Sequence, residues 1–221
     1  MCNNMYFKYS KAELEHLKIK DKKLAKIIER LGPIEREVDG DLFSAVVHHI
    51  VAQQISSKAL ATIWQRLVDT LGVINENTIL KSSDKELNAL GISQRKILYI
   101  KEFAGKVKSG EFNIKAIEKM DDEQAIAELI KLKGIGVWTA QMLLLFCLQR
   151  KNILSYDDLA IRRGMRMVYR HREITKKLFK KYEKRLSPYC SVASLYFWAV
   201  AGGALEDITD PAPKIKKNNA K

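Results

Sequence analysis

The sequence contains few cysteines and prolines and no segment rich in proline or serine. Three of its 221 residues are cysteines and four are prolines. The spacing of Cys2, Cys147 and Cys190 gives neither a disulfide framework nor a zinc-ligand set. Cys147 and Cys190 lie in apolar helix-like runs, where we expect buried thiols. Without internal repeats or a linker, a chain of this length suits one large domain or two small lobes.

Long apolar runs are also missing. The longest, Met142 to Leu148, is far shorter than the about 20 residues needed to cross a bilayer. The N-terminal residues Met1 to Asn4 lack the charged and then apolar plan of a signal peptide. We therefore expect an intracellular protein, located in the cytoplasm or at the nucleoid.

Acidic residues are outnumbered by basic ones. The chain has 39 lysines and arginines against 26 aspartates and glutamates, a net charge of +13. Such an excess favours a polyanionic partner, nucleic acid first, over a merely basic soluble protein. We expect the basic segment from Lys214 to Lys221 to add affinity for phosphate without specificity.

Strand patterns are nearly absent, whereas helix signals are dense. Ser10 to Glu13 and Ser83 to Glu86 match capping boxes, and Gly32, Gly72 and Gly110 follow helix-like runs as stop signals. About ten helices with short connections are expected, which predicts an all-α fold.

A glycine-containing stretch, Leu132 to Ala140, separates two of these helix-like runs. Gly134 and Gly136 bracket Ile135, after a run over 122–131 and before an apolar run over 138–149. Backbone N–H groups at the start of a helix lack intrahelical acceptors and carry partial positive charge, so this turn could hold a phosphate. An ordinary corner between two helices is the alternative.

The segment Tyr156-Asp157-Asp158-Leu159, followed by Arg162 and Arg163, completes a pattern with this turn. In that combination the chain resembles the helix-hairpin-helix, Gly/Pro-rich-loop, catalytic-Asp (HhH-GPD) superfamily of DNA glycosylases, over about Leu31 to Gly203. The group most like it is that of the alkylpurine, or 3-methyladenine, DNA glycosylases II. The resemblance implies two helical lobes flanking a DNA-binding cleft. One lobe would be contiguous over 46–155 and end in the helix-hairpin-helix motif; residues 1–45 and 156–221 would form the other, with the catalytic aspartate.

The family's catalytic aspartate aligns with Asp158. Cleavage of an N-glycosidic bond builds positive charge on the sugar, which a carboxylate beside C1′ would stabilise. The alternative is that Asp157 or Asp158 simply caps the helix that follows. Both roles can hold together, and Asp157 remains a second candidate for catalysis.

Trp138 stands where the bifunctional enzymes of the superfamily have a lysine that attacks C1′. No amine is available there, so the resemblance implies a monofunctional enzyme. An electron-rich indole would stack on a purine made cationic by alkylation. Trp198 aligns with a second aromatic residue of the pocket, and Met142 replaces a further one. For both tryptophans, packing in the core is the alternative.

The resemblance also assigns residues to DNA binding. Gln54 would fill the gap left by a flipped base, and Gln53 would lie beside the flipped nucleotide, although a polar turn between helices is the alternative. The N–H groups of Gly134, Gly136 and Thr139 would hold a phosphate. A monovalent cation could bind the backbone carbonyls, namely those of Ile130, Leu132 and Ile135.

The expected function is base-excision repair of alkylated purines, of the 3-methyladenine and 7-methylguanine class, in double-stranded DNA. A glycosylase for oxidised or deaminated bases and a non-catalytic helix-hairpin-helix module are the alternatives. We expect a monomer with no required cofactor. The chain also lacks the closely spaced cysteines that hold an iron–sulfur cluster in some members.

Overall fold

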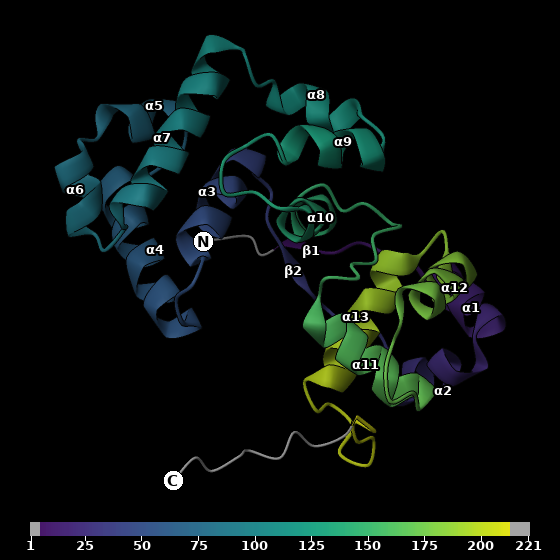
Figure 1. The fold of residues 1–221 in the computed structure, drawn as a ribbon. Helices are drawn as coiled ribbons and strands as arrows, with labels where there is room; N and C mark the ends of the chain where they lie inside the picture. The colour runs from purple at the N-terminus through teal and green to yellow at the C-terminus, as the bar shows by residue number, and fades with distance from the viewer. Residues whose placement is uncertain (1–4, 213–221) are drawn as a thin grey trace, which may run out of the picture. The chain divides into compact units, whose positions relative to one another are not determined.

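The structure is a computed structural model that describes residues 5–212. Within this range it contains thirteen helices and one two-stranded sheet (Figure 1). The sheet pairs β1 (Met5–Tyr6) with β2 (Glu37–Val38). The prediction of an all-α fold is confirmed. Cys2 and the basic segment from Lys214 to Lys221 lie outside the described residues.

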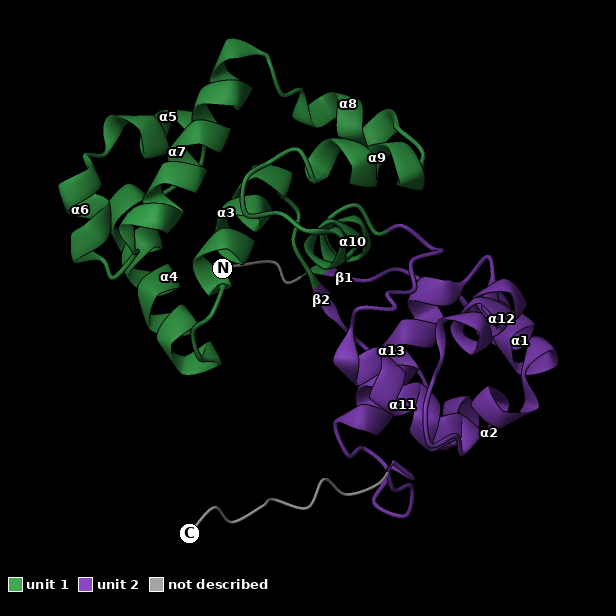
Figure 2. Cartoon of the chain, in the orientation of Figure 1, with its two compact units in different colours: residues 1–5, 38–149 green, residues 6–37, 150–221 purple. Residues whose placement is uncertain are grey.

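The chain forms two compact units (Figure 2). Of the described residues, unit 1 comprises residue 5 and residues 38–149, and unit 2 comprises residues 6–37 and 150–212. These limits differ by several residues from the predicted ones at 46 and 155. At the C-terminal limit, the reason is a set of hydrogen bonds from Ser191, whose N–H donates to the Lys151 carbonyl and whose hydroxyl accepts the Ile153 N–H. The arrangement of two lobes about a DNA-binding cleft stays a prediction.

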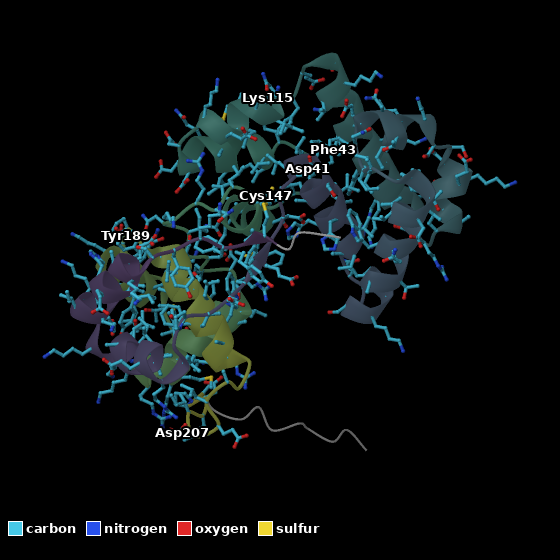
Figure 3. The ribbon with its side chains drawn as sticks, turned by 180° about the vertical axis from the view of Figure 1, so that it is seen from behind. Asp41, Phe43, Lys115, Cys147, Tyr189 and Asp207 are labelled. Atoms are coloured by element: carbon cyan, nitrogen blue, oxygen red, sulfur yellow. The ribbon has the colours of Figure 1, made fainter. Side chains whose placement is uncertain are left out.

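Unit 1 contains eight helices: α3 (Leu42–Ala52), α4 (Ser57–Leu71), α5 (Glu76–Lys81), α6 (Asp84–Ala89), α7 (Gln94–Ser109), α8 (Ile114–Lys119), α9 (Asp122–Leu129) and α10 (Val137–Phe146). Its core includes Phe43 of α3, which Figure 3 labels. The Phe43 ring stacks on that of Phe103 of α7, with centroids 4.8 Å apart. Helix α10 is apolar nearly all round and buries Ala140 and the segment Met142 to Leu145. This position explains why its sequence shows no polar face.

Unit 2 contains five helices: α1 (Lys11–Lys20), α2 (Lys22–Leu31), α11 (Leu159–Tyr169), α12 (Lys176–Leu186) and α13 (Cys190–Ala201). Helices α11 and α13 pack closely because Gly164 has no side chain. A Cβ atom at Gly164 would lie only 2.1 Å from the Phe197 carbonyl oxygen, far inside van der Waals contact. This close pair brings the start of α11 next to α13, which positions the site described below.

Candidate active site

Asp158 occupies the start of α11 and is almost fully buried, at 7% exposure. Its Oδ1 accepts hydrogen bonds from the Ile161 backbone N–H at 2.8 Å and from the Trp198 indole Nε1–H at 3.2 Å. The prediction that an aspartate here caps the helix is therefore confirmed for Asp158. Its catalytic role stays a prediction, and the two roles are compatible because a cap orients the carboxylate without neutralising it.

Asp157, the second candidate, differs from its neighbour in environment. Asp157 is exposed to solvent, whereas Asp158 is buried at the N-terminal, partially positive end of α11. The buried carboxylate of Asp158 accepts hydrogen bonds from a backbone N–H and from an indole N–H. The structure thus distinguishes two adjacent aspartates that local sequence could not.

Trp198 has a contact that sequence reasoning missed. It lies on α13, where the resemblance made it part of a base pocket, but its indole N–H is directed at the Asp158 carboxylate. Forty positions separate the two residues in the chain, so no local pattern could have indicated the bond. Its role in a base pocket stays a prediction.

The glycine turn before α10 has the local geometry that the sequence predicted. Gly134 adopts a left-handed φ of +86°, and the N–H of Ile135 donates to the Leu132 carbonyl at 3.0 Å. Ile135 and Leu132 are both buried, so they anchor the turn in the core of unit 1. Gly136 is the N-cap of α10 and has no side chain to accept the first N–H groups of the helix. Phosphate binding by Gly134, Gly136 and Thr139 stays a prediction.

The predicted cation ligands lie in the same turn. Ile130 is the C-cap residue of α9, and the Leu132 carbonyl already accepts one hydrogen bond. Binding of a monovalent cation stays a prediction.

Trp138, in the first turn of α10, is not a core residue. Its side chain is 41% exposed, so the alternative of simple packing does not describe it. Its indole meets the His49 ring of α3 nearly edge-on, with centroids 6.4 Å apart. Burial, with a smaller contribution from His48, lowers the pKa of His49 to about 4, so this neighbour is uncharged at neutral pH.

Met142, one helical turn after Trp138, is buried at 3% exposure among the core residues of α10. Little of its side chain is therefore available to a ligand. Its contribution to a base pocket stays a prediction.

Gln53 and Gln54 form the turn between α3 and α4. Gln54 is exposed and adopts a left-handed φ of +56°, which is uncommon for a residue with a side chain. The Gln53 Nε2 donates to the Gly134 carbonyl at 2.6 Å, a link that the sequence did not indicate. A wedge role for Gln54 and a place for Gln53 beside a flipped nucleotide stay predictions.

Among residues 5–212 there is no group of three or more histidine, cysteine, aspartate or glutamate side chains that could hold a metal ion. Cys147 and Cys190 are free thiols, and burial raises the pKa of each to about 12. None of the helices in the same range is long and apolar enough to cross a membrane.

Comparison with known proteins gives the family. Residues 47–188 match the model of the HhH-GPD superfamily of base excision DNA repair proteins. The chain belongs to this superfamily. The family prediction made from the glycine turn and Asp158 is therefore confirmed.

Individual relatives cover nearly the whole chain. DNA-3-methyladenine glycosylase 1 of Schizosaccharomyces pombe is 31% identical over 195 residues, which span 86% of this chain and 85% of that protein. The structure of a DNA-3-methyladenine glycosidase from Bacillus halodurans matches with a TM-score of 0.83 and 33% identity, over 92% of this chain and 95% of that one. A 3-methyladenine DNA glycosylase of S. pombe, solved in complex with abasic DNA, matches with a TM-score of 0.76 and 28% identity, over 90% and 100% of the two chains.

Proposed function

We propose that this protein is a monofunctional DNA glycosylase that hydrolyses the N-glycosidic bond of alkylated purines, such as 3-methyladenine and 7-methylguanine, in double-stranded DNA. Family membership and relatives named for 3-methyladenine support the class of reaction. The observation on which the proposal rests is the carboxylate of Asp158, buried and oriented by two N–H donors.

The chemistry needs one fixed negative charge. As the C1′–N bond breaks, its electron pair leaves with the base and the sugar acquires oxocarbenium character. The Asp158 carboxylate stabilises this charge electrostatically, and a water molecule then adds to C1′ and loses a proton. Because its donors hold the carboxylate before the substrate arrives, little reorganisation is needed during the reaction.

The base itself supplies part of the driving force. Alkylation at N3 or N7 makes the purine cationic, which improves it as a leaving group. The exposed indole of Trp138 can stack on such a cation, a contact worth about 1–2 kcal/mol in a dry site. Because Trp138 replaces the lysine that would form a Schiff base, the product is an intact strand with an abasic site.

Binding to duplex DNA is divided among several groups. The N–H groups of Gly134, Gly136 and Thr139 hold a phosphate of the damaged strand, and Gln54 fills the space left by the flipped nucleotide. The net charge of +13 adds a salt-dependent attraction to the backbone. The protein acts as a monomer, and a monovalent cation at the carbonyls of Ile130, Leu132 and Ile135 would stiffen the turn.

The test is release of base from methylated duplex DNA by wild type, Asp158→Asn and the matched control Asp157→Asn. We expect wild type and Asp157→Asn to release 3-methyladenine and 7-methylguanine, and Asp158→Asn to lose nearly all activity. No covalent adduct should be trapped by borohydride. Release of only oxidised or deaminated bases would replace the substrate class, and DNA binding without any release would leave a non-catalytic module.

A further inference from the structure

A side-chain hydrogen bond links the turn between α3 and α4, which contains Gln53 and Gln54 and is called the wedge turn below, to the glycine turn before α10. Gln53 is the C-cap residue of α3, and its Nε2 lies 2.6 Å from the carbonyl oxygen of Gly134, 81 positions later in the chain. A carbonyl can only accept, so the amide must present its nitrogen and not its oxygen. The bond therefore fixes the orientation of the Gln53 side chain as well as the spacing of the two turns.

Gly134 also packs against a second residue, Tyr99. A Cβ atom there would lie 2.8 Å from Cδ2 of Tyr99, a residue of α7, so the Tyr99 ring occupies the space beside the glycine. With its φ of +86°, Gly134 leaves no room for another residue type at this position. The glycine turn is thus packed against α7 and bonded to the end of α3.

The wedge turn is held at several further points. Lys96 of α7 donates from Nζ to the Val51 carbonyl at 2.8 Å, and the hydroxyl of Ser56 accepts the Ala59 N–H at the start of α4. Between these points, Gln54 keeps the left-handed backbone that a residue with a side chain adopts only when its surroundings hold it there. The Gln53 bond joins this strained turn to the glycine turn.

We propose that Gln53 is a positioning residue. Its hydrogen bond to Gly134 couples the position of Gln54, the proposed wedge, to that of the glycine turn, which is proposed to bind a phosphate. This inference rests on the proposed function, in which Gln54 enters the base stack while the glycine turn holds the strand. Because Gln53 bonds the two turns before DNA arrives, neither has to be ordered on binding, and that saved cost appears as affinity. The role is distinct from contact with the flipped nucleotide.

The test is a double-mutant cycle read on binding, with a duplex that carries a tetrahydrofuran abasic analogue beside 2-aminopurine. Gln53→Leu keeps the size of the side chain and removes the donor. We expect it to weaken binding by about three- to ten-fold and to reduce the fluorescence change that reports wedge insertion. In a Gln54→Ala background the same substitution should change affinity by less than about two-fold, because the wedge it positions is gone.

Two further variants keep this test decisive. Gln53→Glu presents a carboxylate that cannot donate at neutral pH, so it must reproduce the loss seen with Gln53→Leu. Gln65→Leu, the same change at an exposed glutamine of α4 bonded to Asp69, should bind DNA as wild type does. The dependence of affinity on salt should be unchanged in Gln53→Leu and Gln65→Leu, because neither substitution adds or removes a charge.

An equal loss from Gln53→Leu with and without Gln54 would overturn the coupling, as would wild-type binding by either Gln53 variant. The proposed function is judged separately, by release of methylated bases from wild type. Coupling without base release would remove the enzymatic function and leave the positioning role; base release without coupling would do the reverse.

Discussion

Helices α10 and α11 begin in opposite ways. Helix α10 starts after Gly136, which has no side chain to meet the first N–H groups, whereas α11 starts after Asp158, whose Oδ1 accepts the Ile161 N–H. Both helix ends carry the same partial positive charge. At α10 the cap residue has no side chain to meet this charge, and at α11 the charge faces the carboxylate of Asp158. The residue at the cap position thus distinguishes the helix start that we propose to bind a phosphate from the one that holds the carboxylate we propose for catalysis.

The largest effect is expected from removing the charge of Asp158 at the start of α11, which is called the closed helix end because a side chain caps it. Asp158→Asn and Asp158→Ala should each lower base release by at least about a hundred-fold, because neither stabilises positive charge on the sugar. Asparagine caps helices nearly as well as aspartate, so only the alanine variant should lose about 1 kcal/mol in the free energy of unfolding. Base release from methylated DNA and urea denaturation measure the two quantities. Activity near wild type in Asp158→Asn would mean that the carboxylate is only a cap.

The next largest effect is expected from placing a capping side chain at Gly136, at the start of α10, which is called the open helix end because its cap residue has no side chain. Gly136 has a φ of −95°, and a Cβ there meets no atom within 4 Å, so a side chain fits without strain. Gly136→Asp should cap α10 with a carboxylate that repels the phosphate, weakening binding to an abasic duplex by about ten-fold or more.

Gly136→Asn is the matched control, since it caps without a full charge. It should bind DNA more tightly than Gly136→Asp at every salt concentration, and both should unfold with a free energy within a few tenths of a kcal/mol of wild type. Equal affinity of the two variants would show that no anion binds this helix end.

Both helix starts could be predicted from the sequence, whereas the end of α10 could not. The glycine turn and the cap at Asp158 were predictable, because each depends on neighbours within a few positions. The run over 138–149 was expected to be one helix, but α10 ends at Phe146 and Gln149 has a left-handed φ of +50°. Nothing in that apolar run is a stop signal, so its end depends on the surrounding fold.

The hydrogen-bond partners of Trp198 and Gln53 were not predictable for a related reason. The bond from Trp198 to Asp158 depends on the packing of α11 against α13, which Gly164 permits. The bond from Gln53 to Gly134 depends on where α3 ends relative to a turn 81 positions later. Both are set by tertiary packing, which has no periodic signature in the sequence. The residue types were recognised, whereas their partners required coordinates.

A smaller effect should follow from removing one hydrogen-bond donor to Asp158 while keeping its charge. Trp198→Phe keeps an aromatic ring on α13 and deletes the indole N–H that donates to Asp158. The carboxylate then loses one of its donors, and we expect kcat for base release to fall by about three- to ten-fold. Binding to an abasic duplex should stay within about two-fold of wild type, because no DNA contact is removed. An unchanged kcat would show that the indole N–H is not needed to orient the carboxylate.

The smallest effect concerns the side chain beside the open end. Burial lowers the pKa of His49 to about 4, from 6.5 for a free histidine, so the folded protein resists its protonation. Between pH 6.5 and 4 the unfolded chain binds a proton at this residue and the folded chain does not, so stability falls as the pH falls through that window. His49 is partly accessible, and we expect its contribution to be on the order of 1 kcal/mol.

His49→Phe keeps a ring against Trp138 and cannot titrate. Urea denaturation at pH 7 and pH 4.5 should show wild type losing more stability than the variant over that interval. His48 and Asp39 also titrate in both proteins, so the difference between the two proteins reports mainly on His49 and its coupling to His48. Equal losses would mean that His49 protonates as freely in the folded protein as in the unfolded chain. In that case the indole beside the open helix end would face a cation in mild acid, and a cationic base would no longer be the ligand it favours.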